Sequence, residues 1–148
     1  MFRKLSALAL LLVIFAAGFI VGRTTDADWL SSAKAQAPGR VFELRTYTTN
    51  PGKLQDLHSR FRDHTTRMFE KHGMVNVGYW APQDQPLAGN TLIYILSYPS
   101  REAAKKSWDA FRADPEWQKA RDASEANGKI VAKVDSVFME ATAFSAIK

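Results

Sequence analysis

Three histidines, His58, His64 and His72, are the side chains of this chain best suited to move a proton near neutral pH. None lies four residues from another, so the sequence lacks the helical histidine pair that binds a metal ion. His58 follows the apolar Leu57 and could face a cavity, where a neutral imidazole can act as a general base. The alternative, which we favour, is a partly buried His58 hydrogen-bonded to a neighbour, and His64 allows the same two interpretations. His72 stands before Gly73 and is expected to interact with the dipole at a helix end.

A second candidate set lies in the segment that begins at Arg40. Arg45 and Tyr47 share one side of a predicted strand with Glu43, because side chains two residues apart point the same way. Arg45 could bind a substrate carboxylate through two parallel hydrogen bonds. The alternative, which we favour, is that Arg45 pairs with Glu43 or with an acid of a partner chain at a dimer interface.

Aromatic side chains could line an apolar pocket for a planar ligand. On strands and inner helix faces they more often form the core, and we prefer that interpretation for Trp108 and Trp117. Tyr94 and Trp80 are the better pocket candidates, since their strands could face the helices. The predicted ligand-binding residues are Arg45, Tyr47, His58, Trp80 and Tyr94, with His58 as the one catalytic candidate.

Several classes of chemistry find no support in the sequence. The chain has no cysteine, which excludes disulfides, zinc–thiolate sites, cysteine-ligated iron–sulfur clusters and a cysteine nucleophile. No glycine-rich phosphate loop, Ser-His-Asp triad or pair of catalytic carboxylates can be recognised, so we predict neither a metal nor a cofactor. The net charge of +5 comes without a basic stripe interleaved with aromatics, so nucleic acid is not an expected partner.

The periodicity of the first half predicts a strand and then a long helix. Residues 40–48 alternate between apolar and polar side chains, which is typical of a strand. Residues 51–72 carry apolar side chains at helical spacing, with Asn50 as a plausible N-cap and Pro51 at the first helical position. Asp56 and Arg60, and likewise Asp63 and Arg67, are spaced for ion pairs along this helix. Gly73 is expected to end it in the left-handed conformation.

The second half repeats the alternation of strand and helix. Residues 74–81 predict a strand, and the almost wholly apolar residues 91–98 predict a central strand covered on both faces. Ser100 and Asp114 are expected to cap two helices, the second of which ends at Asn127-Gly128, and residues 129–144 predict the last strand.

This β-α-β-β-α-β order predicts an α+β, ferredoxin-like sandwich, in which one face of an antiparallel sheet carries the helices. A second copy of the chain is the economical cover for the other face, which predicts a dimeric α+β barrel and a homodimer.

The N-terminus is predicted to direct the protein out of the cytoplasm. Arg3 and Lys4 precede an apolar run at residues 5–21, so residues 1–23 predict a signal peptide or a single-span membrane anchor. Residues 24–39 predict a flexible tether, and residues 40–148 the folded domain. The small residues around Ala35 suit signal peptidase. We therefore expect an exported protein of the cell envelope or periplasm, released after cleavage near Ala35 or held in the membrane through residues 5–21.

Five stretches in a fixed order resemble the NIPSNAP family over residues 41–145: "ELRTYT", "PGKLQDLHSRFRDHT", "FEKHGMVNVGYW", "NTLIYILSYPSREAAKKSW" and "DPEW". The resemblance implies a ferredoxin-like monomer that pairs into a dimeric α+β barrel, grouped with small monooxygenases, muconolactone isomerases and stress-response barrel proteins. Family members commonly end in a Pro-Thr-Asp-Tyr-Ser-Pro-like tail. Residues 141–146 here read "ATAFSA" and lack both prolines, the acid and the phenol.

Two functions follow as hypotheses. The first is a domain that binds a small apolar or aromatic molecule in a pocket between sheet and helices; if it is an enzyme, the resemblance implies a cofactor-independent monooxygenase or isomerase. The second is a non-catalytic dimeric interaction module of the cell envelope. The absence of a convergent acid–base set in the sequence favours the second, whereas a histidine among aromatics favours the first.

Overall fold

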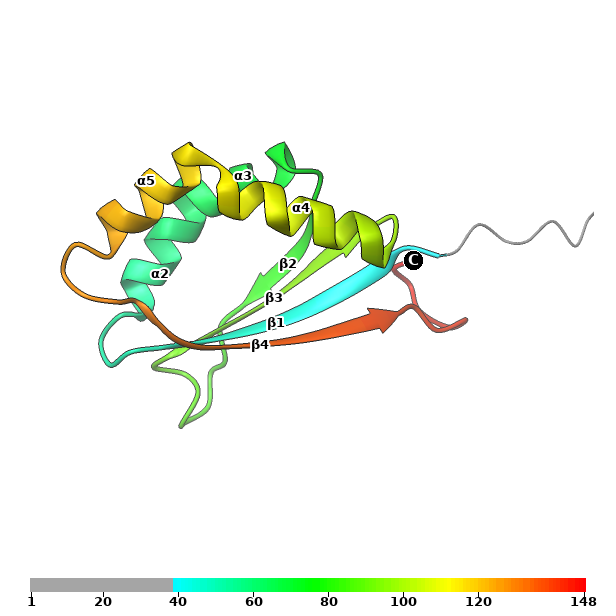
Figure 1. The fold of residues 1–148 in the computed structure, drawn as a ribbon. Helices are drawn as coiled ribbons and strands as arrows, with labels where there is room; N and C mark the ends of the chain where they lie inside the picture. Colours follow the sequence, from blue (N-terminus) through cyan, green and yellow to red (C-terminus); the bar gives the residue numbers. More distant parts are fainter. Residues whose placement is uncertain (1–38) are drawn as a thin grey trace, which may run out of the picture. The chain divides into compact units, whose positions relative to one another are not determined.

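The computed structural model describes residues 39–148, which form a four-stranded antiparallel sheet with all the helices on one face (Figure 1). The strands lie in the order β2-β3-β1-β4, which is the ferredoxin-like order and confirms the predicted α+β class. The strands are β1 (Val41–Thr49), β2 (Val75–Trp80), β3 (Thr91–Tyr98) and β4 (Val131–Glu140), and the helical elements are α2 (Leu54–Arg60), η1 (Phe61–Thr65), α3 (Thr66–Lys71), α4 (Arg101–Ala113) and α5 (Pro115–Ser124).

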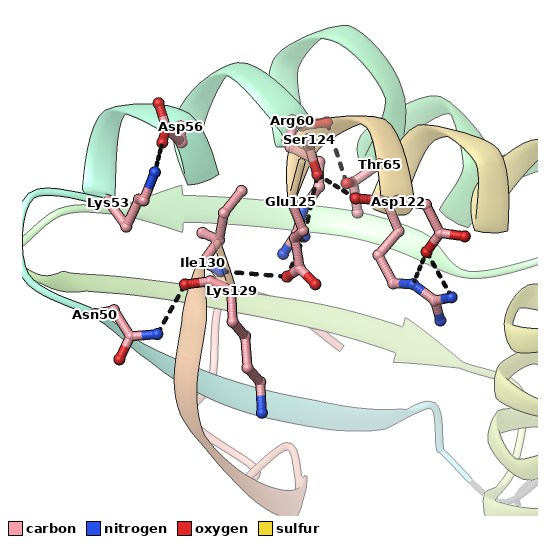
Figure 2. Close-up of polar contacts among 11 residues, drawn as sticks. Asn50, Lys53, Asp56, Arg60, Thr65, Asp122, Ser124, Glu125, Lys129 and Ile130 are labelled. Atoms are coloured by element: carbon pink, nitrogen blue, oxygen red, sulfur yellow. Dashed lines mark hydrogen bonds and ion pairs between the residues drawn. The ribbon is translucent and has the colours of Figure 1, made fainter. Parts of the chain in front are cut away.

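The first helix begins later than predicted and contains a π-helical turn. Pro51 and Gly52 form a turn instead of helix, with Gly52 at a φ of +74°, and α2 begins at Leu54. The side chain of Asn50 does not cap the helix; its Nδ2 donates to the carbonyl of Lys129 at 2.7 Å (Figure 2). The π-helical turn η1 then separates α2 from α3.

The predicted ion pairs along this helix are wrong. Arg60 is buried and reaches across to Glu125, just after α5, with 3.1 Å between Nη1 and Oε1 (Figure 2). The same Glu125 oxygen accepts the backbone N–H of Ile130 at 3.3 Å, so the contact also fixes the segment that leads into β4. The other three residues bind different partners: Asp56 pairs with Lys53, Asp63 with Arg62, and Arg67 with Glu116.

The caps of α4 and α5 and the end of the first helix agree with the sequence prediction, whereas α5 ends at Ser124, before the predicted Asn127-Gly128. Ser100 accepts the N–H of Ala103 at 3.1 Å, and Asp114 accepts the N–H of Glu116 at 2.8 Å. Gly73 follows the first helix with a φ of +76°, in the left-handed region where a side chain is strained.

The core lies between the helices and one face of the sheet, called here the helix face. This face presents the alternate residues Leu92, Tyr94, Leu96 and Tyr98 of β3, which are 5% exposed or less. Rings from the helices pack on them, namely Phe61, Phe69, Trp108 and Phe111. Burial of this continuous apolar layer is what holds the helices on the sheet.

The opposite face of the sheet, called here the open face, is not covered by any helix of residues 39–148. β3 is an interior strand of the sheet, as predicted. Its open-face residues Ile93 and Ile95 are only partly buried, so residues 39–148 of a single chain do not cover the strand fully on both faces. β4 ends at Glu140, not at residue 144, and residues 141–148 form no strand.

The predicted signal peptide or anchor at residues 1–23, and the tether as far as residue 38, lie outside the described residues. Within residues 39–148, no helix has the length and apolar character needed to cross a membrane.

Candidate functional site

A cavity of about 360 Å³ lies between the first helix and the β2–β3 side of the sheet. We call it the His58 cavity; its lining residues are His58, Phe61, Arg62, Thr66, Tyr79, Trp80, Ala81 and Leu92. Phe61 and Arg62 belong to the π-helical turn, and His58 and Thr66 flank it. Single π-helical turns inside α-helices recur at functional sites, and here the turn forms one wall of the cavity.

His58 contributes a buried polar atom to this cavity. Its side chain is half-buried, and no group of residues 39–148 forms a hydrogen bond with the buried Nε2. The favoured interpretation, a histidine bonded to a neighbour, is therefore wrong for this nitrogen in the described structure. Because a buried polar atom usually has a partner, Nε2 is a natural contact for a ligand.

The wall of the cavity is aromatic. The ring of Phe61 lies 5.2 Å from that of Tyr94 and 5.8 Å from those of Tyr47 and Tyr79. Tyr79 also stacks on Tyr94, with 5.4 Å between ring centroids. Tyr47 and Tyr94 lie on the helix face, but neither lines the His58 cavity; Phe61 and Tyr79 do. Neither Phe61 nor Tyr79 is among the predicted ligand-binding residues, which include Trp80 from the same strand as Tyr79.

Tyr94 carries a second unpartnered polar atom. The residue is completely buried, and its hydroxyl has no hydrogen-bond partner in the described part of the chain. Burial and then the neighbouring Tyr47 raise the pKa of Tyr94 well above its usual value, so the phenol stays protonated at physiological pH. Burial likewise raises the pKa of Tyr79. Tyr79 and Tyr94 therefore do not act as phenolate bases, and the Tyr79 hydroxyl already donates to the side chain of Asn76.

Trp80 is predicted to face the helices, but its side chain lies on the open face. Neighbouring residues of a strand face opposite sides, so only one of Tyr79 and Trp80 can lie on the helix face. The register pairs Tyr79 with Tyr94 and Trp80 with Ile93, which puts Trp80 on the open face. Its ring lies so close over Gly78 that a Cβ there would come within 2.7 Å of it. Trp80 borders the His58 cavity at the end of β2, while 51% of its surface is exposed.

Arg45 pairs with Glu43, as one of the favoured alternatives predicted, but the pair lies under α4 on the helix face. Glu43 is 1% exposed and accepts four hydrogen bonds: from Arg45 (2.6 Å), Ser136 (2.6 Å), Trp108 Nε1 (2.7 Å) and Tyr98 (2.8 Å). Burial alone would raise the pKa of Glu43, but the bonds from Ser136, Trp108 and Tyr98 together with Arg45 outweigh it and lower the pKa. Glu43 is therefore a fixed carboxylate that orients Arg45.

Arg45 also borders a second cavity, of about 460 Å³, between α4 and the strands β1 and β4. We call it the cationic cavity; its lining residues are Glu43, Arg45, Arg101, Glu102, Lys105, Trp108, Arg112 and Phe138. This cavity is not among the sites predicted from the sequence. The available signal was the spacing of Arg101, Lys105 and Arg112, four and then seven residues apart, which places them on one side of a helix.

The other two histidines do not join either cavity. His64 is exposed, and the Nε2 of His72 lies 2.8 Å from a carboxylate oxygen of Asp114, the cap of α5. His72 thus stands at the helix end as predicted and also links α3 to α5. Residues 39–148 contain no group of three histidine or acidic side chains placed to hold a metal ion.

Comparison with known proteins gives a family and a fold. The NIPSNAP family model matches residues 42–146. A NIPSNAP family protein with unknown function from Agrobacterium tumefaciens is 19% identical with a TM-score of 0.65, over 75% of this chain and 96% of that one. A NIPSNAP-like domain protein from Burkholderia xenovorans is 18% identical with a TM-score of 0.63, over 73% of this chain and 90% of that one.

A variant of SnoaB, a cofactor-independent oxygenase from Streptomyces nogalater, is 16% identical with a TM-score of 0.50, over 72% of this chain and 98% of that one. Identities this low show a shared fold and nothing about a shared ligand. No curated protein gives a significant match.

Proposed function

Because the chain belongs to the NIPSNAP family, whose similar solved members share its sheet-and-helix fold, we propose that it binds a small apolar or aromatic molecule in the His58 cavity. The observation that carries this proposal is the buried, unpartnered Nε2 of His58 in a cavity with an aromatic wall. A volume of about 360 Å³ suits a molecule of one or two rings.

The lining indicates the chemistry of this ligand. Phe61, Tyr79 and Leu92 offer apolar contact, whereas His58 offers one hydrogen bond. We therefore expect a planar ligand with a hydroxyl or carbonyl group at the His58 end. If the protein is an enzyme, His58 would exchange a proton with that group, which is the chemistry a cofactor-independent oxygenase or isomerase requires.

Histidine NMR provides a direct test, since the chain has only three histidines. We would label the full chain with ¹⁵N-histidine and add 2-naphthol, a neutral two-ring molecule with one hydroxyl group. The expected result is a shift of the His58 imidazole signals, with His64 and His72 unchanged because neither lines the cavity. Equal shifts of all three, or none at millimolar probe, would contradict the proposal.

The variants His58→Ala and His64→Ala form a matched pair on the same helix. We expect His58→Ala to weaken 2-naphthol binding by about tenfold or more, the value of one buried hydrogen bond, while His64→Ala leaves it unchanged. If His58→Ala lowers only the midpoint of thermal unfolding, His58 is structural and the ligand-binding proposal fails.

The open face supports a second candidate, the non-catalytic dimeric module. Val75, Trp80 and Val137 are 47%, 51% and 55% exposed, and Ile95 lies among them. A second copy that turns the same face toward the first would bury these side chains and complete a dimeric barrel. Analytical ultracentrifugation of the full chain should then give twice the chain mass at micromolar concentration, and a monomer would refute the homodimer.

We also propose that the protein is exported and then stays anchored through residues 5–21 or is released near Ala35. The support is the sequence pattern alone, with a basic start, an apolar run and small residues at positions 33, 35 and 37. Fractionation of cells that express the full chain, with mass determination of the product, tests this. An intact chain in the cytosol would exclude export.

A further inference from the structure

We propose that the cationic cavity between α4 and β4 is a second binding site, which holds the carboxylate or phosphate group of a small molecule. It shares no lining residue with the His58 cavity, so the two sites can be tested independently. Four basic residues line it against two carboxylates, Glu43 and Glu102.

Of these two acids, Glu43 already accepts four hydrogen bonds and has little capacity to neutralise the other basic residues. Lys105 and Arg112 both pair with one exposed residue, Asp109, at 2.8 and 2.6 Å. One carboxylate shared by two cations leaves a net positive charge at the cavity mouth. An entering anion would meet an attractive field there.

Arg101 is the residue best placed to bind the anion. No acidic side chain of residues 39–148 lies within 4.0 Å of its guanidinium, whose central carbon lies 3.7 Å from the ring centroid of Phe138. A guanidinium over a ring uses its flat face for that contact and keeps its N–H edges for a planar anion. Arg101 is also the first residue of α4, where the helix dipole disfavours a cation, so helix stability does not account for it.

Arg45 forms the buried end of the same cavity. Glu43 holds its Nη1 at 2.6 Å, and its guanidinium carbon lies 4.2 Å from the ring centroid of Trp108. Its Nε is buried and has no partner among the described residues. A fixed, already oriented guanidinium loses little freedom when it binds an anion, which is the physical basis of preorganised recognition.

Isothermal titration of the full chain with sodium acetate and, separately, with inorganic phosphate at low ionic strength tests the proposal; neither probe has an aromatic ring that would fit the His58 cavity. We expect at least one anion to bind, and the tighter of the two identifies the group as a carboxylate or a phosphate. In Arg101→Gln the dissociation constant should rise about tenfold or more, which corresponds to about 1.4 kcal/mol. Arg101→Lys should restore only part of the affinity, because an ammonium cannot offer two parallel N–H groups.

The matched control is Lys106→Gln, which removes the same charge from the same helix at a position outside the cavity lining. The dissociation constant of the Lys106→Gln variant for each anion should stay within about twofold of the wild-type value. His58→Ala should also leave anion binding unchanged, which separates this site from the His58 cavity. The proposal is overturned if neither anion binds at millimolar concentration, if Lys106→Gln loses as much affinity as Arg101→Gln, or if Arg101→Gln changes only thermal stability.

Discussion

Each of the two cavities is lined by a residue with a buried polar atom that has no hydrogen-bond partner among the described residues. Four such side-chain atoms occur in residues 39–148: Arg45 Nε, His58 Nε2, Arg60 Nε and Tyr94 OH. Each costs the fold about 1–3 kcal/mol if nothing compensates it. Arg60 has a structural contact through its ion pair with Glu125, whereas the other three are residues that the sequence analysis named as ligand contacts. For His58 and Arg45, which line the cavities, a ligand that completes the missing hydrogen bond would offset this cost.

Glu43 represents the opposite case, a buried charge whose partners are all present. In Glu43→Gln the ion pair with Arg45 is lost, and an amide nitrogen must replace one of the two accepting oxygens. We expect the free energy of unfolding to fall by about 3 kcal/mol, measured by urea denaturation. Glu102 is an exposed acid beside the cationic cavity, and Glu102→Gln should change the free energy of unfolding by less than about 0.5 kcal/mol. Equal effects in both variants would contradict the role of Glu43.

Glu43 should also make the fold sensitive to acid. Its pKa is lowered in the folded protein despite burial, through the bonds from Ser136, Trp108 and Tyr98 and the charge of Arg45. Its contribution to stability is therefore complete above the pKa of the unfolded chain and is lost as the pH falls through the lower, folded pKa. Urea denaturation between pH 7 and pH 3 should show a steeper loss of stability in the wild type than in Glu43→Gln. Parallel curves would mean that Glu43 does not titrate with unfolding.

Among the elements, the π-helical turn η1 links the fold to the His58 cavity. The hydroxyl of Thr65, a buried residue, donates to the carbonyl of Arg60 at 3.1 Å and so supports the widened turn. In Thr65→Val, which keeps the shape of the side chain, we expect a loss of about 1 kcal/mol in urea denaturation and weaker 2-naphthol binding. Thr66→Val is the matched control for stability, since no hydrogen bond of its hydroxyl is found in the described structure; because Thr66 lines the His58 cavity, it is not a control for binding. An unchanged Thr65→Val protein would mean that the turn needs no such support.

The order and type of the elements could be predicted from the sequence, whereas the course of the first helix could not. Ser100, Asp114 and Gly73 mark helix ends through local contacts, and local contacts are what a sequence pattern records. Asn50 and Pro51 suit a helix start and a turn equally well, and the contact of Asn50 with Lys129, 79 residues away, decides for the turn. The π-helical turn changes the angular spacing between Asp63 and Arg67, so this predicted pair does not form. Asp56 and Arg60 both lie within α2, and their pair fails because Arg60 turns inward to Glu125.

For the candidate sites too, features set by local sequence could be predicted, whereas contacts between distant segments could not. Alternation along β1 and β3 placed Tyr47 and Tyr94 correctly on one face, because strand periodicity is a local property. Trp80, and not Tyr79, is the predicted ligand contact, because alternation alone does not tell which of two neighbouring aromatics meets the helices. The cationic cavity combines α4 with Glu43 and Phe138, which are 95 residues apart along the chain. Only the folded structure brings such distant segments together.

At the scale of the whole molecule, the two faces of the sheet differ in kind. The helix face is closed by aromatic rings and carries both cavities, whereas the open face shows apolar side chains that no helix of residues 39–148 covers. Part of it borders a groove of about 280 Å³, between Ile95 and the C-terminal residues Thr142 and Ser145. An apolar sheet face of this kind is expected to pair with another surface in solution.

Two valines of β4 can test this pairing, because they lie three residues apart on opposite faces. Val137 is opposite Leu44 on the open face, and Val134 is opposite Tyr47 on the helix face, where it is 41% exposed at the sheet edge. If two copies pair through their open faces, Val137→Glu places two buried charges in the interface and should shift ultracentrifugation profiles to the monomer. Val134→Glu adds the same charge outside that interface and should remain a dimer. Dissociation by both variants, or by Val134→Glu alone, would show that the copies pair through the edge or the helix side of β4.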